Sequence, residues 1–229
     1  MATQDELKQQ AATQAAAMVQ PGTVLGVGTG STVAFFIDAL GERNRQQSLN
    51  LKAIVTTSNR SRQQLEANGF TVSELAAVDH VDLCIDGADR VDHDLNGIKG
   101  GGGALTLEKN VAINATHNVW IVDQSKVVDR LGGFPLPVEV LPVSCEQNFR
   151  RFDQLALQPQ YRLNEDGSRY VTHYGNYIID LAVDPLPIPA GLAALLDQTV
   201  GVVEHGLFLN MTDEVLIATP EKIEHWTRQ

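Results

Sequence analysis

From the N-terminus to about residue 122, short apolar runs alternate with segments whose apolar residues recur at three- and four-residue intervals. Strands are predicted at residues 23–27, 51–57, 81–85 and 119–122. Helices are predicted at residues 61–68 and 105–115, and from the glycine turn that follows residue 27. This alternation predicts a parallel sheet with helices on both faces.

The helix predicted before the first strand has signals at both ends. Thr3 and Glu6 have the spacing of a capping box, and Pro21 with Gly22 ends the helical pattern. Gly69 stands where a glycine would cap the helix at residues 61–68. The elements of this half of the chain are therefore delimited by their own local sequence.

After Leu131 the pattern changes, because three prolines follow within a dozen residues. A helix is predicted from Ser144, with Gln147 completing a second capping box, and a turn at Asp166-Gly167. Further elements are predicted as strands in YIIDLAV (177–183) and GVVEHGLF (201–208), a helix at 192–199, and one strand and one helix in the tail at 213–226. We predict a Rossmann-like α/β domain at residues 1–130 and 209–229, and a smaller α+β domain at 131–208.

Composition and charge restrict the function classes. The chain has 229 residues, is 43% hydrophobic and carries a formal net charge of −11, which disfavours a nucleic-acid partner. No apolar run approaches the ~18 residues of a membrane span, and the polar N-terminus does not resemble an export signal. Cys84 and Cys145 form no C-x-x-C pair, so we expect two buried thiols. These features favour a cytoplasmic protein that binds a small molecule.

Ligands of open parallel sheets bind beyond the carboxyl ends of the strands, and three loops there carry unusual residues. The first is GVGTGST, residues 26–32, which lacks the third glycine of a dinucleotide fingerprint because Ser31 stands there. Ser31 and Thr32 at a helix N-terminus favour a phosphate site. The alternative is a simple helix cap with glycines that allow tight packing.

The second loop is DGAD, residues 86–89, directly after a predicted strand. Two carboxylates this close raise each other's pKa, an arrangement typical of proton handling. A polar ligand is the favoured interpretation. A plain turn is the second, and a metal site that also uses Asp92, His93 and Asp94 is the third.

The third loop is KGGGGALTLEK, residues 99–109, in which four glycines imply close approach of the backbone to a ligand. Glu108 has apolar helical neighbours at three and four residues on both sides, so its carboxylate is predicted on the buried face. Burial raises its pKa while the helix N-terminus lowers it, a balance that suits a general base. The alternative is a glutamate that only complements the helix dipole.

Together these motifs resemble the type A family of ribose-5-phosphate isomerases over nearly the whole chain. VGTGST, DGAD, IKGGGGAL, FPLPVEV, GNYIID and GVVEHGLF occur in the family's order and spacing. The resemblance implies isomerisation of ribose 5-phosphate and ribulose 5-phosphate through a cis-enediol(ate), without metal or organic cofactor, in the pentose phosphate pathway. It also implies a homodimer or homotetramer.

The resemblance also assigns residues. It implies Glu108 as catalytic base, with Asp86, Asp89 and Lys99 as further catalytic groups. It implies substrate binding by Thr29, Gly30, Ser31, Thr32, Asp86, Gly87, Ala88, Asp89, Lys99, Gly100, Gly101, Gly102 and Lys126. Lys8, whose motif matches the family less closely, is also expected to reach the phosphate. The chain departs from the family pattern at Arg90, Leu107 and His173-Tyr174, and none of these removes a proton-transfer group. Arg90 could lower the pKa of Asp86 or Asp89.

Three other functions remain to be distinguished. A coenzyme A transferase would use a glutamate as nucleophile. A sugar-phosphate sensor would need an output domain, for which this chain has no room. An aminosugar-phosphate deaminase would need a ring-opening histidine, and His93 is the one candidate near the acidic loop.

Overall fold

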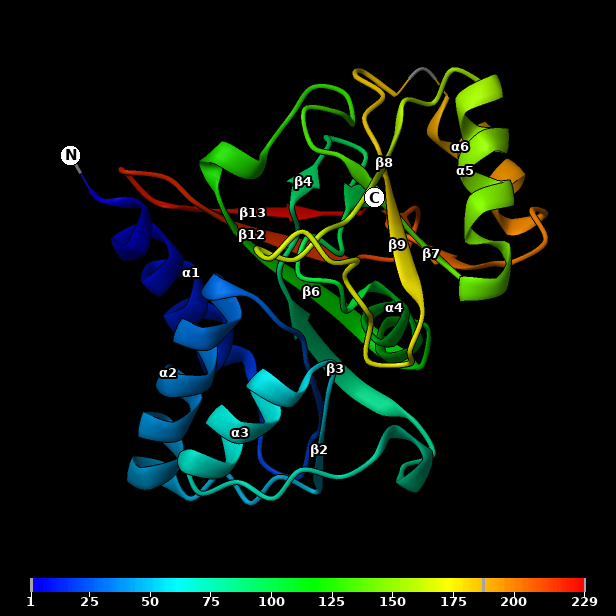
Figure 1. Cartoon of the computed structure of the whole chain (residues 1–229). Helices are drawn as coiled ribbons and strands as arrows, with labels where there is room; N and C mark the ends of the chain where they lie inside the picture. Colours follow the sequence, from blue (N-terminus) through cyan, green and yellow to red (C-terminus); the bar gives the residue numbers. More distant parts are fainter. Residues whose placement is uncertain (1, 187, 229) are drawn as a thin grey trace. The chain divides into compact units, whose positions relative to one another are not determined.

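The computed structural model describes residues 2–186 and 188–228 (Figure 1). The chain forms two compact units. Within the described residues, unit 1 comprises 2–88, 107–127 and 210–228, and unit 2 comprises 89–106 and 128–209. The sequence-based division placed residues 89–106 in the larger domain, whereas the structure groups them with the smaller one.

Unit 1 is built on a six-stranded sheet with the order β13-β12-β6-β3-β1-β2. Its strands are β1 (Val24–Val27), β2 (Ala53–Thr56), β3 (Val81–Asp86), β6 (Ala115–Asp123), β12 (Glu214–Ala218) and β13 (Ile223–Thr227). Its helices are α1 (Gln4–Met18), α2 (Ser31–Gln47), α3 (Asn59–Ala67) and α4 (Leu105–Ile113), the last of which begins in unit 2. All strand pairs are parallel except β12 with β13, which confirms the predicted parallel sheet.

Helices cover both faces of this sheet, as the sequence predicted. On one face, α1 and α2 lie side by side (Figure 1). Their apolar residues pack with alternate residues of the strands, such as Leu25 and Ile85. On the other face, Val111 of α4 packs against Val81 and Cys84. A Cβ atom at Gly26 would lie 2.8 Å from the Val111 side chain, so a glycine in β1 lets α4 approach the sheet.

The predicted caps of the first helices are confirmed. Thr3 and Glu6 form both hydrogen bonds of the capping box, and Gly69 has a φ of +85° after α3. Both cysteines are buried. No helix in the described part of the chain is long and apolar enough to span a bilayer.

Unit 2 contains two smaller sheets, with the orders β10-β7-β9-β8 and β11-β5-β4. Their strands are β4 (Arg90–Val91), β5 (Gly97–Ile98), β7 (Leu136–Val140), β8 (Pro159–Tyr161), β9 (Tyr177–Leu181), β10 (Val202–His205) and β11 (Leu207–Phe208). Helices α5 (Cys145–Gln154) and α6 (Pro189–Asp197) complete the unit. The described part of the chain also has short 3-10 turns, two in unit 1 at Leu75–Ala77 and Gln124–Lys126 and one in unit 2 at Pro142–Ser144. A core around Phe152, Val138 and Ile179 holds the larger sheet.

Three local predictions are wrong. The tail forms a β-hairpin of β12 and β13, not a strand and a helix, because the few residues after Pro220 gain a full ladder by pairing with β12. The capping box at Ser144 does not form, because a 3-10 turn precedes α5 and the Ser144 hydroxyl donates to the Leu141 carbonyl instead. The predicted strand at 201–208 is two strands in different sheets, interrupted at Gly206.

Candidate active site

The 28–32 loop runs from the end of β1 into the first turn of α2. Gly28 donates its N–H to the Ile85 carbonyl, and a Cβ atom there would lie 1.8 Å from Asp86 Oδ1. Gly30 is the N-cap of α2 and has a φ of +118°, which favours glycine. Ser31 is therefore the first helical residue rather than the cap, so the simple helix-cap interpretation of Ser31 is wrong.

This helix N-terminus has the features of an anion site. Ala34 makes the first helical hydrogen bond, to the Gly30 carbonyl, so the N–H groups of Ser31, Thr32 and Val33 precede the ladder. The first turn of α2 contains no acidic side chain. Amides and the helix dipole thus favour a bound phosphate here.

Asp86 at the end of β3 is buried and holds the 28–32 loop by its carboxylate. Its Oδ1 atom accepts the N–H groups of Thr29 at 3.1 Å and Gly87 at 2.7 Å. Hydrogen bonds to an ionised group are about twice as strong as neutral ones, so this contact fixes the turn firmly. Asp86 therefore has a structural role that the sequence did not indicate.

Hydroxyl groups from the junction of β2 and α3 support the same loop. Ser58 Oγ donates to Thr29 Oγ1 at 2.9 Å, and Ser61 Oγ donates to the Gly28 carbonyl at 2.7 Å. Ser58 also caps α3 by accepting the Ser61 N–H. One helix cap thus serves the neighbouring loop as well.

Asp89 belongs to unit 2 and lies half-buried next to β4. Its Oδ2 atom accepts the Gly101 N–H at 2.8 Å, which brings the second and third predicted loops together within unit 2. Arg90 donates to the main-chain carbonyls of Asp89 and Gly133, so its described hydrogen bonds go to backbone rather than to a carboxylate.

The geometry of residues 86–94 does not support their interpretation as a metal site. Asp92 Oδ1 accepts the N–H groups of Asp94 and Asn96, which makes it the acceptor of its own turn. His93 lies 3.4 Å from Asp129, an exposed carboxylate. Within residues 2–186 and 188–228, the grouping of potential metal ligands lies elsewhere, at Asp197, Glu204 and His205.

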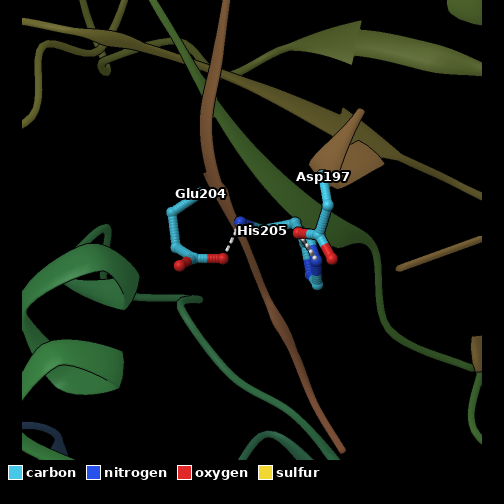
Figure 2. Close-up of side chains that lie close together, drawn as sticks. All are labelled: Asp197, Glu204 and His205. Carbon is cyan, nitrogen blue, oxygen red and sulfur yellow. Dashed lines mark hydrogen bonds and ion pairs between the residues drawn. The ribbon is translucent and has the colours of Figure 1, made fainter. Parts of the chain in front are cut away.

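That second grouping is explained by hydrogen bonds (Figure 2). The Leu207 N–H donates to His205 Nδ1 at 3.2 Å, so the ring proton lies on Nε2, which is 3.1 Å from Asp197. The Glu204 carboxylate accepts the His205 N–H at 2.8 Å. His205 thus supports the bend between β10 and β11, with a carboxylate at the end of α6.

Lys99 follows β5 and is buried at 3% exposure. Its N–H donates to the Gly206 carbonyl, and its ammonium nitrogen lies 5.3 Å from the centre of the Phe208 ring. A Cβ atom at Gly206 would lie 2.2 Å from the Lys99 carbonyl oxygen, so the bend needs glycine for this close approach. The segment that interrupts the predicted strand is therefore the support of Lys99.

The 99–103 loop continues from Lys99 with two glycines in positive-φ conformations, which glycine adopts without strain. Gly100 and Gly103 have φ values of +99° and +77°, and the Gly103 N–H donates to the Gly100 carbonyl. Tyr170 covers Gly103, because a Cβ atom there would lie 2.4 Å from the tyrosine hydroxyl. Gly102 has open space around its Cα, in contrast to its neighbours.

Glu108 lies in the first turn of α4, in the part of the helix that belongs to unit 1. It is buried at 4% exposure, and its helical neighbours Leu105, Val111 and Ala112 are buried too. The prediction of a carboxylate on the buried face is confirmed. The dipole interpretation explains a glutamate in the first turn but not its burial.

The other two lysines predicted to bind the substrate, Lys126 and Lys8, belong to unit 1. Lys126 is half-buried in the 3-10 turn Gln124–Lys126, directly after β6. Lys8 of α1 forms an ion pair with Asp5 at 3.3 Å, and its side chain is 13% exposed. Their roles in substrate binding stay predictions.

Sequence reasoning missed the residues that hold the loops, namely Ser58, Ser61, Tyr170, Gly206 and Arg162, the last of which donates to the Gly100 and Gly101 carbonyl oxygens. Ser58 had a local signal, because it precedes a helical segment as an N-cap serine would. The others had none, since their contacts join segments far apart in the chain.

Comparisons with known proteins agree on one family. The family model described as ribose 5-phosphate isomerase A (phosphoriboisomerase A) matches residues 53–222. The chain is 71% identical to ribose-5-phosphate isomerase A of Lactobacillus johnsonii over 94% of this chain and 93% of the relative, and 48% identical to that of Bifidobacterium longum over 96% and 94%.

Solved structures show the same likeness. The structure of ribose 5-phosphate isomerase A from Neisseria gonorrhoeae has a TM-score of 0.91 at 38% identity and covers 100% of this chain and 99% of that one. A D-ribose-5-phosphate isomerase in complex with phospho-erythronic acid has a TM-score of 0.95 at 32% identity, covering 99% and 100%.

Proposed function

The chain belongs to the ribose 5-phosphate isomerase A family, and on that premise we propose that it interconverts D-ribose 5-phosphate and D-ribulose 5-phosphate through a cis-enediol(ate), with Glu108 as the general base. The observation that carries this proposal is the burial of the Glu108 carboxylate on an otherwise apolar helix face. A buried carboxylate is retained where chemistry needs it, because its desolvation is unfavourable.

The reaction moves one proton between adjacent carbons. Once the sugar ring is open, Glu108 removes the proton from C2 of the aldose, beside the carbonyl. The electron pair forms the enediolate, with the negative charge on O1. The proton of the C2 hydroxyl passes to O1, with Asp86 and Asp89 as the carriers of hydroxyl protons, and the protonated Glu108 returns its proton to C1 to give the ketose. A single carboxylate is enough for the transfer between the two carbons, and general-base catalysis of this kind contributes typically about 10²–10⁴-fold.

Negative charge develops on the carbonyl oxygen during this step, and unit 2 supplies donors suited to it. Lys99 is held by its backbone to Gly206, and the 99–103 loop offers amide groups without side chains in the way. One preorganised donor of this kind contributes about 3 kcal/mol to lowering the barrier. Asp89 orients the loop by accepting the Gly101 N–H.

The phosphate of the substrate would bind at the 28–32 loop, through the amides and hydroxyls of Ser31 and Thr32. Asp86 holds that loop and would accept a hydrogen bond from a sugar hydroxyl, which assists ring opening. Gly87, Ala88 and Lys126 complete the proposed contacts, and Lys8 could approach the phosphate. The chemistry needs neither metal nor organic cofactor.

We further propose that the enzyme works in the cytoplasm, in the pentose phosphate pathway, as a homodimer or homotetramer. Light scattering of the purified protein measures the number of subunits. A monomeric mass at micromolar concentration would exclude both assemblies.

A direct assay tests the proposed activity. Purified protein is incubated with ribose 5-phosphate in the presence of EDTA, and ketopentose formation is followed. We expect turnover that chelation does not reduce. Loss of turnover with EDTA and recovery with a divalent ion would reject the metal-free mechanism, and no turnover under any condition would reject the activity.

A further inference from the structure

Arg162, directly after β8, donates hydrogen bonds to main-chain carbonyl groups of the 99–103 loop. Its Nη1 group donates to the carbonyl oxygens of Gly100 at 2.8 Å and Gly101 at 3.1 Å. The side chain is 14% exposed, so most of the guanidinium is withdrawn from solvent. Arg162, Gly100 and Gly101 all belong to unit 2, and Arg162 lies 62 positions after Gly100 and 61 positions after Gly101.

The guanidinium is itself held in place from its other side. Asp180 of β9 accepts hydrogen bonds from Nε at 2.9 Å and from Nη2, in the two-pronged geometry that arginine forms with carboxylates. The backbone of Arg162 is fixed as well, because its N–H donates to the Ile178 carbonyl and its carbonyl accepts the Tyr170 N–H. The donors that face the loop therefore have little freedom.

This grip determines which way the loop amides point. In a trans peptide the C=O and N–H bonds point in opposite directions. Because Arg162 binds the Gly100 carbonyl, the Gly101 N–H faces away from it, and indeed donates to Asp89 at 2.8 Å. By the same geometry, binding of the Gly101 carbonyl turns the Gly102 N–H away from Arg162.

We propose that Arg162, anchored by Asp180, is a positioning residue for the isomerase reaction, which holds the Gly101 and Gly102 amides toward Asp89 and the substrate oxygens. This inference rests on the proposed function. Arg162 touches no reacting atom. Its effect is to keep the loop in the one orientation in which its amides stabilise the developing oxyanion.

A positioning role predicts a specific kinetic pattern. The Arg162→Ala variant loses both carbonyl contacts, so the loop samples other orientations and kcat falls about 10- to 100-fold. KM changes less than about threefold, because the donors act mainly on charge that develops in the transition state. Added millimolar guanidinium restores at least part of the lost kcat, since it can occupy the space between Asp180 and the loop.

Arg169 provides the matched control in the same unit. It pairs with Glu146 and lies over the rings of Tyr161 and Tyr177, at 4.1 and 5.4 Å, but its described contacts do not include the loop. Arg169→Ala also removes an arginine from an ion pair on this part of unit 2. We expect its kcat within about twofold of the parent and unchanged by guanidinium.

Two further variants cover the case in which Arg162→Ala does not fold. Arg162→Lys keeps the charge but cannot hold two carbonyls and two carboxylate oxygens together, and Asp180→Asn loosens the anchor. We expect kcat to fall in both variants, but by less than the loss of about 10- to 100-fold that removal of both carbonyl contacts would cause. Hydrogen exchange of the peptide at residues 99–106 should be at least about tenfold faster in these variants than in the parent.

The outcomes separate the two proposals. Parental kcat in Arg162→Ala, or an equal loss in Arg169→Ala without guanidinium rescue, would overturn the positioning role. Unchanged hydrogen exchange of residues 99–106 in every variant would overturn the claim that Arg162 orders the 99–103 loop. An inactive parent would overturn the proposed isomerase function, and with it the catalytic consequence, while the exchange rates would still decide whether Arg162 orders the loop.

Discussion

The 28–32 loop of unit 1 and the 99–103 loop of unit 2 are both rich in glycine, but groups of opposite charge hold them. In the 28–32 loop, the Asp86 carboxylate accepts the Thr29 N–H, and the Ser61 hydroxyl donates to the Gly28 carbonyl. In the 99–103 loop, the Arg162 guanidinium donates to two carbonyl oxygens, and Asp89 accepts one N–H group, that of Gly101. The first loop is thus held mainly by an anion and the second mainly by a cation.

The difference corresponds to what each loop is proposed to bind. The first loop can give up the Thr29 N–H, because the amides at the start of α2 remain for a phosphate. The second loop also leads into a helix N-terminus, that of α4 at Leu105, but the first turn of this helix carries the acidic Glu108, so we expect the loop's own amides to be the donors. With the cation on the carbonyl side, the Gly101 and Gly102 amides face the opposite side, where the Gly101 N–H donates to Asp89.

Of the two loops, the second is expected to show the larger effect. Lys99→Met removes the ammonium group but keeps most of the buried length, so kcat should fall about 10²–10³-fold with an unchanged fold. Steady-state kinetics and circular dichroism of the variant measure both. Turnover close to that of the parent would show that the glycine-loop amides act without the lysine.

The packing of the first loop is tested by a pair of glycine substitutions. Gly28→Ala would bring a methyl group into Asp86, while Gly102→Ala points into open space. We expect Gly28→Ala to lower the free energy of unfolding by about 1–3 kcal/mol and Gly102→Ala to change it by less than about 0.5 kcal/mol. Urea titrations compare the two, and equal stabilities would show that Asp86 can move aside freely.

The assignment of phosphate to the first loop predicts an effect on substrate binding. Replacing Ser31 and Thr32 by alanine should raise KM about tenfold and change kcat little, because the phosphate is held alike in the ground and transition states. The 99–103 loop variants should show the opposite pattern. A larger loss in kcat than in KM here would move the phosphate away from α2.

A small effect is expected at Asp82, which holds the start of β1 as Asp86 holds the loop after its end. Asp82 accepts the Val24 N–H at 2.7 Å, and this hydrogen bond, together with His80, holds the pKa of Asp82 below its ordinary 3.8. Since the pKa is lower in the folded state, Asp82 stabilises the fold above about pH 4, and this contribution is lost as the pH falls below that value.

The Asp82→Asn variant should therefore be less stable than the parent at pH 7 by less than about 1 kcal/mol, since the carboxylate is half exposed. The difference should shrink on acidification toward pH 3. Thermal unfolding at several pH values measures it, and a difference that grows on acidification would have the wrong sign for this account.

The same comparison shows what sequence can predict. The 28–32 loop was predicted well because its signals are local: a strand, glycines and a helix N-terminus follow one another directly. Glu108 was predicted on the buried face because helical periodicity alone decides that face. These features need no knowledge of distant segments.

The support of the 99–103 loop could not be predicted, because Arg162 reaches it from a strand far along the chain. Its placement depends on the register of β8 with β9, which few local residues specify. The role of Gly206 could not be predicted for the same reason, because the break between β10 and β11 is explained by the close approach of Gly206 to the Lys99 carbonyl. The tail resembled a helix in its composition, and its pairing with β12 decided otherwise.

The role of Glu108 is the central claim, and solvent exchange tests it most directly. In deuterated water, the parent should introduce deuterium at C1 or C2 of the sugar during isomerisation, unless the shielded carboxylate returns the same proton. Glu108→Gln keeps the size of the side chain but cannot accept the proton, so it should bind substrate while neither exchanging nor isomerising it. We expect kcat to fall about 10²–10⁴-fold. If Glu108→Gln retained more than about a tenth of the parental kcat, a different group would be the base.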